Sequence, residues 1–302
     1  MSTIPVSNNF EKIIPVDSSL EKLFSGTVWA EGPVWKEGKL IWSDVRSNKM
    51  YSYNQKSNLS EVFRDPSGFN NGNCLDNEGR LVRCQHGFRR IIREEENGDI
   101  TIIADKYQEK KFNSPNDVAV KKDGTIWFTD PPYGILTNEE GTKATSEQEG
   151  NFVFKVLQDG TVEKILDNFD KPNGIVFSPN ENFLYVGDSG AASPGNIDLS
   201  KPHHVKRYTL SDEGKPMNEQ IFCEIEGGFP DGMVSDNQGN LFICDPHGQK
   251  IHIYDDASSY LGVINMPERV ANCTFGGEDK SQLFITASSS LYLLKTNTIG
   301  AK

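Results

Sequence analysis

Short runs of alternating apolar and polar residues, separated by glycine-rich or asparagine-rich turns, follow one another along the chain. One clear example spans 115–134, where two apolar segments flank a Lys-Asp-Gly turn. This pattern predicts a β-hairpin, because β-branched and aromatic residues favour strands and Asp-Gly favours the turn between them. We find no long segment with the 3.6-residue period of an amphipathic helix.

The same hairpin pattern occurs six times, at 31–45, 71–87, 115–134, 172–190, 230–248 and 271–289. A third alternating run follows each hairpin, and a fourth follows in all but the last. Six four-stranded units in 302 residues predict a six-bladed β-propeller. We expect a strand at 21–27 to complete the last blade and close the ring. Residues 1–302 would then form a single domain, with 1–20 as an N-terminal extension.

Polar residues recur where the first strand of each unit begins. In a propeller this strand lines the central channel, so these residues would form a ring around one channel mouth. The ring consists of Glu31, Asn71, Asn116, Asn173, Asp231 and Asn272. A single Asn or Asp after proline is ordinary turn chemistry, but Glu31 has no such local reason. Carboxylates that face each other across a channel repel unless a cation lies between them, so the ring predicts a metal site.

The ligand types indicate which metal would bind. Carboxylate and amide oxygens, without Cys or His, suit a hard cation. Ca²⁺ fits best, with Mg²⁺, Mn²⁺ or Zn²⁺ as substitutes, although zinc normally recruits His or Cys.

The loops that leave the second strands should open on the same face as the ring. Polar residues in these loops are candidates for the pocket rim: His86, Asp130, Tyr133, Asp188, Ser189, Asp245 and His247. An aspartate ends the second strand in four of the six units, at Asp44, Asp130, Asp188 and Asp245. Capping of turns therefore explains these aspartates as well as substrate contact does. His86 is equally consistent with a substrate contact or a hydrogen bond within the scaffold. Insertions at 135–150 and 191–203 lengthen two of these loops and would form lids, specificity walls or plain surface loops.

Composition excludes several classes of function. The formal net charge of −12 argues against binding to phosphate backbones, so no nucleic-acid partner is expected. Neither a secretory signal nor an apolar run of about 18 residues is present, so we expect no membrane partner. Five cysteines, an odd number without a Cys-x-x-Cys pair, favour a reducing, cytoplasmic location.

The chain resembles the SMP-30/gluconolactonase/LRE-like family, and most closely its bacterial gluconolactonase branch. The resemblance rests on AEGPVW (30–35), NGNCLDNEGRLVRCQHGFRR (71–90), NSPNDVAVKKDGTIWFTDPPYG (113–134), KPNGIVFSPN (171–180), PDGM (230–233) and ANCTFGG (271–277). It implies a six-bladed propeller with one divalent ion, usually calcium, held by Glu31, Asn116, Asn173 and Asp231. It also implies hydrolysis of a sugar lactone such as D-glucono-1,5-lactone, with Asp231 as general base; direct attack by Asp231 is the alternative.

One departure from the family pattern leaves the identity of the substrate undetermined. In the animal branch an arginine contacts the substrate at the position that Ser114 occupies here. Sugar recognition must therefore come from elsewhere, and the candidate substrate contacts are Asn71, His86, Ser114, Asp130, Tyr133 and Asn272. Two other functions remain: a related hydrolase acting on another lactone, an aryl ester or an organophosphate, and a non-catalytic binding platform. A platform would not need paired carboxylates in its channel. The oligomeric state stays open.

Overall fold

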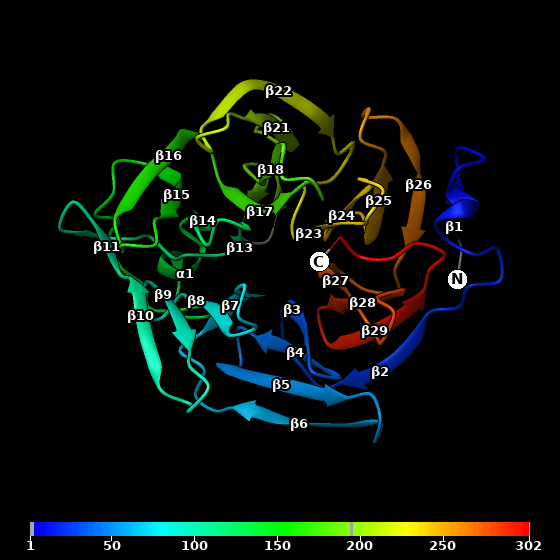
Figure 1. Cartoon of the computed structure of the whole chain (residues 1–302), viewed down its shortest axis with the longest axis horizontal. Helices are drawn as coiled ribbons and strands as arrows, with labels where there is room; N and C mark the ends of the chain where they lie inside the picture. The colour runs from blue at the N-terminus through cyan, green and yellow to red at the C-terminus, as the bar shows by residue number, and fades with distance from the viewer. Residues whose placement is uncertain (1–2, 194–195, 302) are drawn as a thin grey trace.

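Six antiparallel β-sheets are arranged in a ring, as a computed structural model of residues 3–193 and 196–301 shows (Figure 1). The predicted six-bladed propeller is confirmed. The strands of blades one to three are β3 (Ala30–Lys36), β4 (Lys39–Asp44), β5 (Lys49–Asn54), β6 (Leu59–Arg64), β7 (Asn70–Leu75), β8 (Leu81–Gln85), β9 (Arg90–Glu94), β10 (Ile100–Ala104), β13 (Val118–Val120), β14 (Ile126–Asp130), β15 (Asn151–Val156) and β16 (Val162–Phe169). The strands of blades four to six are β17 (Pro172–Phe177), β18 (Phe183–Asp188), β21 (His204–Leu210), β22 (Pro216–Glu224), β23 (Met233–Ser235), β24 (Leu241–Asp245), β25 (Lys250–Tyr254), β26 (Tyr260–Asn265), β27 (Val270–Gly276), β28 (Gln282–Ala287) and β29 (Ser290–Lys295).

The ring closes through the N-terminal strand, as expected. β2 (Glu21–Ser25) pairs antiparallel with β29, with Lys22 opposite Tyr292 and Ser25 opposite Ser290. Blade six therefore has the order β2-β29-β28-β27 and leaves no open edge at the junction.

A few elements were not anticipated from the sequence. The segment before β2 adds a fifth strand, β1 (Thr3–Pro5), to the outer edge of blade five and continues through the short 3₁₀ helix η1 (Phe10–Lys12). The hairpin of β11 (Lys106–Tyr107) and β12 (Lys110–Lys111) lies in the connection between blades two and three. The helix α1 (Tyr133–Leu136) and the hairpin of β19 (Ala192–Ser193) and β20 (Asn196–Ile197) lie between the second and third strands of blades three and four.

The hydrophobic core is divided among the blade interfaces. Each of six apolar clusters lies mainly between two neighbouring blades, where the inward residues of facing sheets meet. Between blades six and one, for example, Trp42 and Leu40 pack with Phe284. The alternation in the sequence is therefore the signature of sheets packed face to face around a ring.

Glycines follow several of the ring residues because neighbouring blades approach closely at the channel. A Cβ on Gly32 would lie 2.1 Å from the carbonyl oxygen of Asn71, and one on Gly232 would lie 2.0 Å from Cγ of Asn272. Both distances are far below van der Waals contact, so any side chain would push the blades apart. The Glu-Gly and Asp-Gly pairs thus serve packing between blades rather than turn formation alone.

None of the helices in the described part of the chain is both long enough and apolar enough to cross a membrane.

Candidate active site

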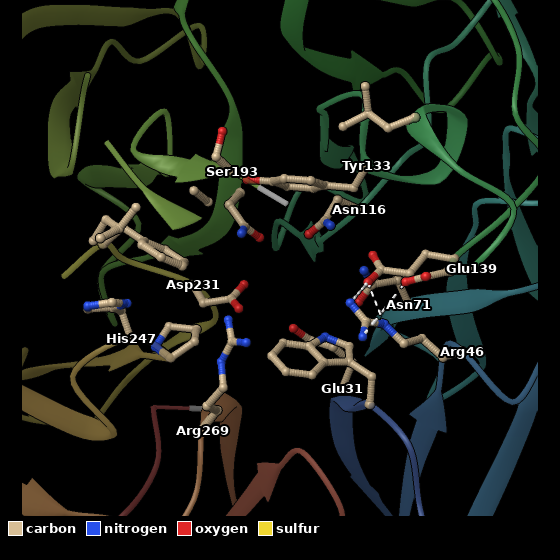
Figure 2. A pocket seen from close by; sticks show the side chains of 18 of the residues that line it. Glu31, Arg46, Asn71, Asn116, Tyr133, Glu139, Ser193, Asp231, His247 and Arg269 are labelled. Carbon is tan, nitrogen blue, oxygen red and sulfur yellow. Dashed lines mark hydrogen bonds and ion pairs between the residues drawn. The ribbon is translucent and has the colours of Figure 1, made fainter. Parts of the chain in front are cut away.

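A cavity of about 460 Å³ opens at one mouth of the channel. Five of the six ring residues line it: Glu31, Asn71, Asn116, Asn173 and Asp231. Each lies at or just before the start of a different first strand, so five blades contribute one polar side chain each. Figure 2 shows the labelled members of this set around the cavity. The predicted convergence of oxygen-bearing side chains is therefore present in the fold.

The carboxyl group of Asp231 is buried and repelled by a second acid. Its side chain is 6% exposed and lies where Asp231 N–H donates to Cys244 of β24 (2.8 Å). Burial, and then the negative charge of Glu31, raise the pKa of Asp231 well above its usual value, while the amide of Asn173 opposes the rise. A carboxylate with a raised pKa is a better proton acceptor than an ordinary aspartate.

Glu31 is held in place by its neighbours. One carboxylate oxygen accepts hydrogen bonds from the backbone N–H of Gly32 (2.7 Å) and from the side chain of Asn272 (3.1 Å). Burial raises the pKa of Glu31 to about 8, and the charge of Asp117 adds to the rise. Two buried acids therefore share one cavity at an electrostatic cost that a cation would remove.

The amide side chains add neutral oxygen donors. Asn116 is 5% exposed, and its side-chain amide has no hydrogen-bond partner within the described residues. Its backbone is fixed because its N–H donates to Thr129 (2.9 Å). An amide that borders the cavity without a protein partner is open to water or to a ligand, so Asn116 is suited to a ligand-binding position.

This donor set fits a hard divalent cation better than zinc. The described parts of the chain, 3–193 and 196–301, contain no group of three or more His, Cys, Asp or Glu side chains placed to hold a metal. The cavity instead combines two carboxylates with amide groups, which is the chemistry that Ca²⁺ and Mg²⁺ accept. Glu31, Asn116, Asn173 and Asp231 are therefore suitable ligands.

Four of the expected substrate contacts do not line the cavity: His86, Ser114, Asp130 and Asn272. Ser114 is fully buried; its hydroxyl donates to the carbonyl of Pro131 (2.6 Å) and accepts from the N–H of Gly134 (2.9 Å). Asp130 accepts hydrogen bonds from the N–H groups of Asn113 (2.7 Å) and Ser114 (2.8 Å). It thus caps the loop that enters blade three, and Asp188 does the same for Asp170 and Lys171 in blade four.

Asn272 lies behind the cavity rather than in it. It lines a second cavity of about 320 Å³, whose walls are residues further along the first strands and whose lining includes Asp117 and Ala301 near the C-terminus. Its contact with the site is the hydrogen bond to Glu31. The N–H of Gly232 donates to Ala271 just as the N–H of Gly72 donates to Asn116, so Ala271 rather than Asn272 takes the ring position in blade six.

His86 also acts from behind the cavity. Its Nδ1 lies 3.0 Å from the carbonyl oxygen of Glu140, which can only accept, so Nδ1 carries the proton. Its Nε2 then accepts from the side-chain amide of Asn71 (3.3 Å). Burial lowers the pKa of His86 to about 4, so the ring is neutral at physiological pH. The histidine thereby orients the amide of Asn71 toward the cavity.

Tyr133 does line the cavity, as expected. Its hydroxyl is fully enclosed and has no hydrogen-bond partner of normal geometry among the described residues. Burial and the negative charge of Asp231 raise the pKa of the Tyr133 hydroxyl well above its usual value. The hydroxyl is therefore protonated at neutral pH, and the tyrosine side chain borders the same cavity as Asp231 (Figure 2).

Sequence reasoning missed an aromatic and cationic wall made of Trp29, Arg46 and Arg269. All three line the cavity, and both guanidinium groups lie over the Trp29 ring, at 5.4 Å for Arg46 and 5.3 Å for Arg269. Arg46 follows a second strand, so the rule that selected Tyr133 could have found it. Arg269 precedes a first strand, and no sequence signal marked it.

The insertion at 135–150 forms a wall of the cavity through Leu136, Glu139 and Glu140. Arg46 of blade one donates two hydrogen bonds to Glu140, at 2.9 and 2.8 Å. Arg89 pairs with Glu147 (3.1 Å), which ties the far part of the loop to blade two. The insertion at 191–203 contributes Ala192, Ser193, Asn196 and Ile197 to the opposite part of the lining.

Comparison with known proteins identifies the family. The family model for the SMP-30/gluconolactonase/LRE-like region matches residues 29–289. A gluconolactonase of Zymomonas mobilis is 33% identical over 97% of this chain and 86% of its own length. Regucalcin of Xenopus laevis is 24% identical over 85% of this chain and 82% of its own. The solved structure of a Xanthomonas campestris gluconolactonase superimposes with a TM-score of 0.88 at 31% identity, covering 98% of this chain and 95% of that one. The chain belongs to the SMP-30/gluconolactonase/LRE-like family.

Proposed function

We propose that this protein hydrolyses a sugar lactone, such as D-glucono-1,5-lactone, to the open-chain hydroxy acid, and that it requires a divalent cation for the reaction. The observation that carries the proposal is the pair of buried acids, Glu31 and Asp231, in one cavity with the unpartnered amide of Asn116. The gluconolactonases of Zymomonas mobilis and Xanthomonas campestris support the substrate class, and regucalcin by its name supports calcium.

Glu31, Asn116, Asn173 and Asp231 would hold the cation, with Ca²⁺ as the best fit to their oxygens. Bound there, the cation would polarise the lactone carbonyl and stabilise the negative charge that develops on its oxygen. Glu31 is suited to a purely holding role, because its hydrogen bonds from Gly32 and Asn272 fix one of its oxygens.

Asp231 would act as the general base. Its carboxylate takes a proton from water while the water oxygen bonds to the carbonyl carbon. The ring C–O bond then breaks, and the ring oxygen leaves as a hydroxyl after receiving the proton back from Asp231. The same carboxyl group thus takes the proton in the first step and returns it in the second. Direct attack of Asp231 on the carbonyl is the competing mechanism.

The neutral side chains would orient the sugar. Tyr133 lines the cavity with its side chain while its hydroxyl is enclosed, and Asn71 supplies an amide whose orientation His86 fixes. The amide can bind substrate hydroxyls without competing for the cation.

Acid release tests the proposal directly. In weak buffer, D-glucono-1,5-lactone should be hydrolysed well above the spontaneous rate, and exhaustive treatment with EDTA should abolish the excess. Adding back Ca²⁺, Mg²⁺, Mn²⁺ or Zn²⁺ separately should restore activity, most fully with Ca²⁺. Failure to hydrolyse any lactone with any of these ions would contradict the enzymatic assignment. Full activity in protein free of metal by elemental analysis would contradict the metal requirement alone.

Replacement of His86 by alanine should lower kcat/KM about 10-fold, because a residue that orients a binding side chain through a hydrogen bond typically contributes about 10- to 100-fold. The pH–rate profile should keep its shape between pH 5.5 and 9, since the pKa of His86 is about 4 and the ring does not titrate in this range. The matched control is His252→Ala, a buried histidine that contacts Tyr260 and Asp245 and does not line the cavity. A changed profile, or an equal loss in the control, would argue against the positioning role.

A further inference from the structure

Arg269 contributes a second guanidinium to the cavity wall. Among the described residues this guanidinium has no ion pair and no hydrogen bond, and it lies over the Trp29 ring, 5.3 Å from the ring centroid. Figure 2 shows its side chain pointing to the same cavity that receives Asp231. The five N–H donors of this group are therefore free to meet a ligand.

Arg46 provides an internal comparison on the same indole ring. Its guanidinium lies 5.4 Å from the Trp29 ring and also lines the cavity, but it is engaged by Glu140 at 2.8 Å and by Glu139 at 4.0 Å. One arginine of the pair is thus neutralised by the protein and holds the 135–150 wall, whereas the other is left uncompensated. A planar guanidinium stacked on an aromatic ring has few remaining orientations, which prepares it for two-point contact with an oxyanion.

We propose that Arg269, stacked on Trp29, is a specificity-determining residue that binds an anionic substituent of the lactone, a carboxylate or a phosphate carried away from the reacting carbonyl. This inference rests on the proposed lactonase activity and narrows its substrate class. Arg269 enters the cavity from the blade six side and is not one of the oxygen-bearing ring residues, so it can contact a substituent of the substrate without being a ligand of the cation. His247 and Gln249, which also line the cavity, can add hydrogen bonds to the same group.

The charges of the cavity lining include one guanidinium that no carboxylate of the described residues engages. A divalent cation would balance Glu31 and Asp231, while Arg46 pairs with Glu140 and lies 4.0 Å from Glu139. Arg269 is therefore the guanidinium of the lining that can pair with an anionic group of the substrate. Guanidinium binds carboxylate and phosphate through two parallel hydrogen bonds, whereas a sugar hydroxyl offers no compensating charge.

The test compares three lactones under identical metal loading: neutral D-glucono-1,5-lactone, 6-phosphoglucono-1,5-lactone and D-glucaro-1,4-lactone. The wild-type protein should show a higher kcat/KM for at least one anionic lactone than for the neutral one. Arg269→Gln should raise KM for that anionic lactone about 10- to 100-fold, the range for hydrogen bonds to charged groups, with kcat nearly unchanged. The same variant should leave KM for the neutral lactone within about twofold, and Arg269→Lys should recover part of the loss. Comparison of the phosphate-bearing lactone with the carboxylate-bearing lactone shows which oxyanion Arg269 recognises.

The matched control is Arg207→Gln. Arg207 also lies over aromatic rings, at 5.0 Å from Phe183 and 5.3 Å from Phe222, but it does not line the cavity. It should change none of the KM values. The inference is overturned if the wild type hydrolyses the neutral lactone with no preference for either anionic one, or if Arg269→Gln affects neutral and anionic lactones equally. Absence of all lactone hydrolysis would instead overturn the proposed function.

Discussion

Asp231→Asn is expected to lower kcat for lactone hydrolysis by about 10²- to 10⁴-fold, the usual contribution of a general base. Asparagine keeps the shape of the side chain but cannot accept a proton from water. The residue it replaces is buried, faces Glu31 and has its pKa raised by both effects. The loss should therefore fall mainly on kcat, measured by acid release at saturating lactone and saturating Ca²⁺.

A second aspartate in the same blade supplies the control. Asp236 is fully buried, but it accepts hydrogen bonds from Gln238 (2.9 Å) and Asn240 (2.8 Å) in a turn that does not line the cavity. Asp236→Asn should cost stability while kcat stays within about threefold. If Asp231→Asn retained more than a tenth of wild-type kcat with metal bound, Asp231 would not be the base.

Metal-free protein should lose stability as pH rises from 5 to 8, and Ca²⁺ should reverse the loss. The folded-state pKa of Glu31 is raised to about 8 and that of Asp231 well above its ordinary value, so the unfolded chain releases these protons at lower pH than the folded chain does. A raised pKa stabilises the fold below the unfolded pKa and ceases to do so as pH rises through the folded pKa. The decrease should be on the order of 3 kcal/mol, or about 6 °C in Tm.

Calcium changes the sign of this dependence because it binds the ionised pair. In thermal melts with EDTA or excess Ca²⁺, the gain in Tm from Ca²⁺ should be larger at pH 8 than at pH 5. The double variant Glu31→Gln, Asp231→Asn removes the repulsion and should be more stable than metal-free wild type at pH 8, with no response to Ca²⁺. A response to Ca²⁺ in this variant equal to that of the wild type would locate the cation elsewhere.

The fold could be predicted because each blade repeats the same local pattern. Apolar runs such as 126–130 and 183–188 become second strands that are buried on both faces, and the strand boundaries in the structure agree closely with these runs. The ring of polar residues followed from the same repetition. Glu31 was separable from turn chemistry by sequence alone, because glutamate has no use in a turn.

The rest of the site depends on contacts between blades that sequence spacing does not encode. His86 is adjacent to a rim loop, yet its ring turns inward because Asn71 of its own blade and Glu140 of blade three satisfy both nitrogens. Arg269 lies over the ring of Trp29, which comes from the opposite end of the chain. In blade six Ala271 takes the ring position, and Asn272 lies behind it. Such placements arise from tertiary packing, which the spacing of residues along one sequence does not indicate.

Blade six unites β2 with β27–β29, so its sheet joins segments separated by nearly the full length of the polypeptide. During synthesis, β2 cannot pair with β29 until the last blade has left the ribosome. Closing so large a loop is entropically slow, and such long-range pairing delays folding. We therefore expect the nascent chain to expose unpaired, aggregation-prone strand edges throughout translation. It should depend on chaperones more than a protein of equal size built from local contacts does.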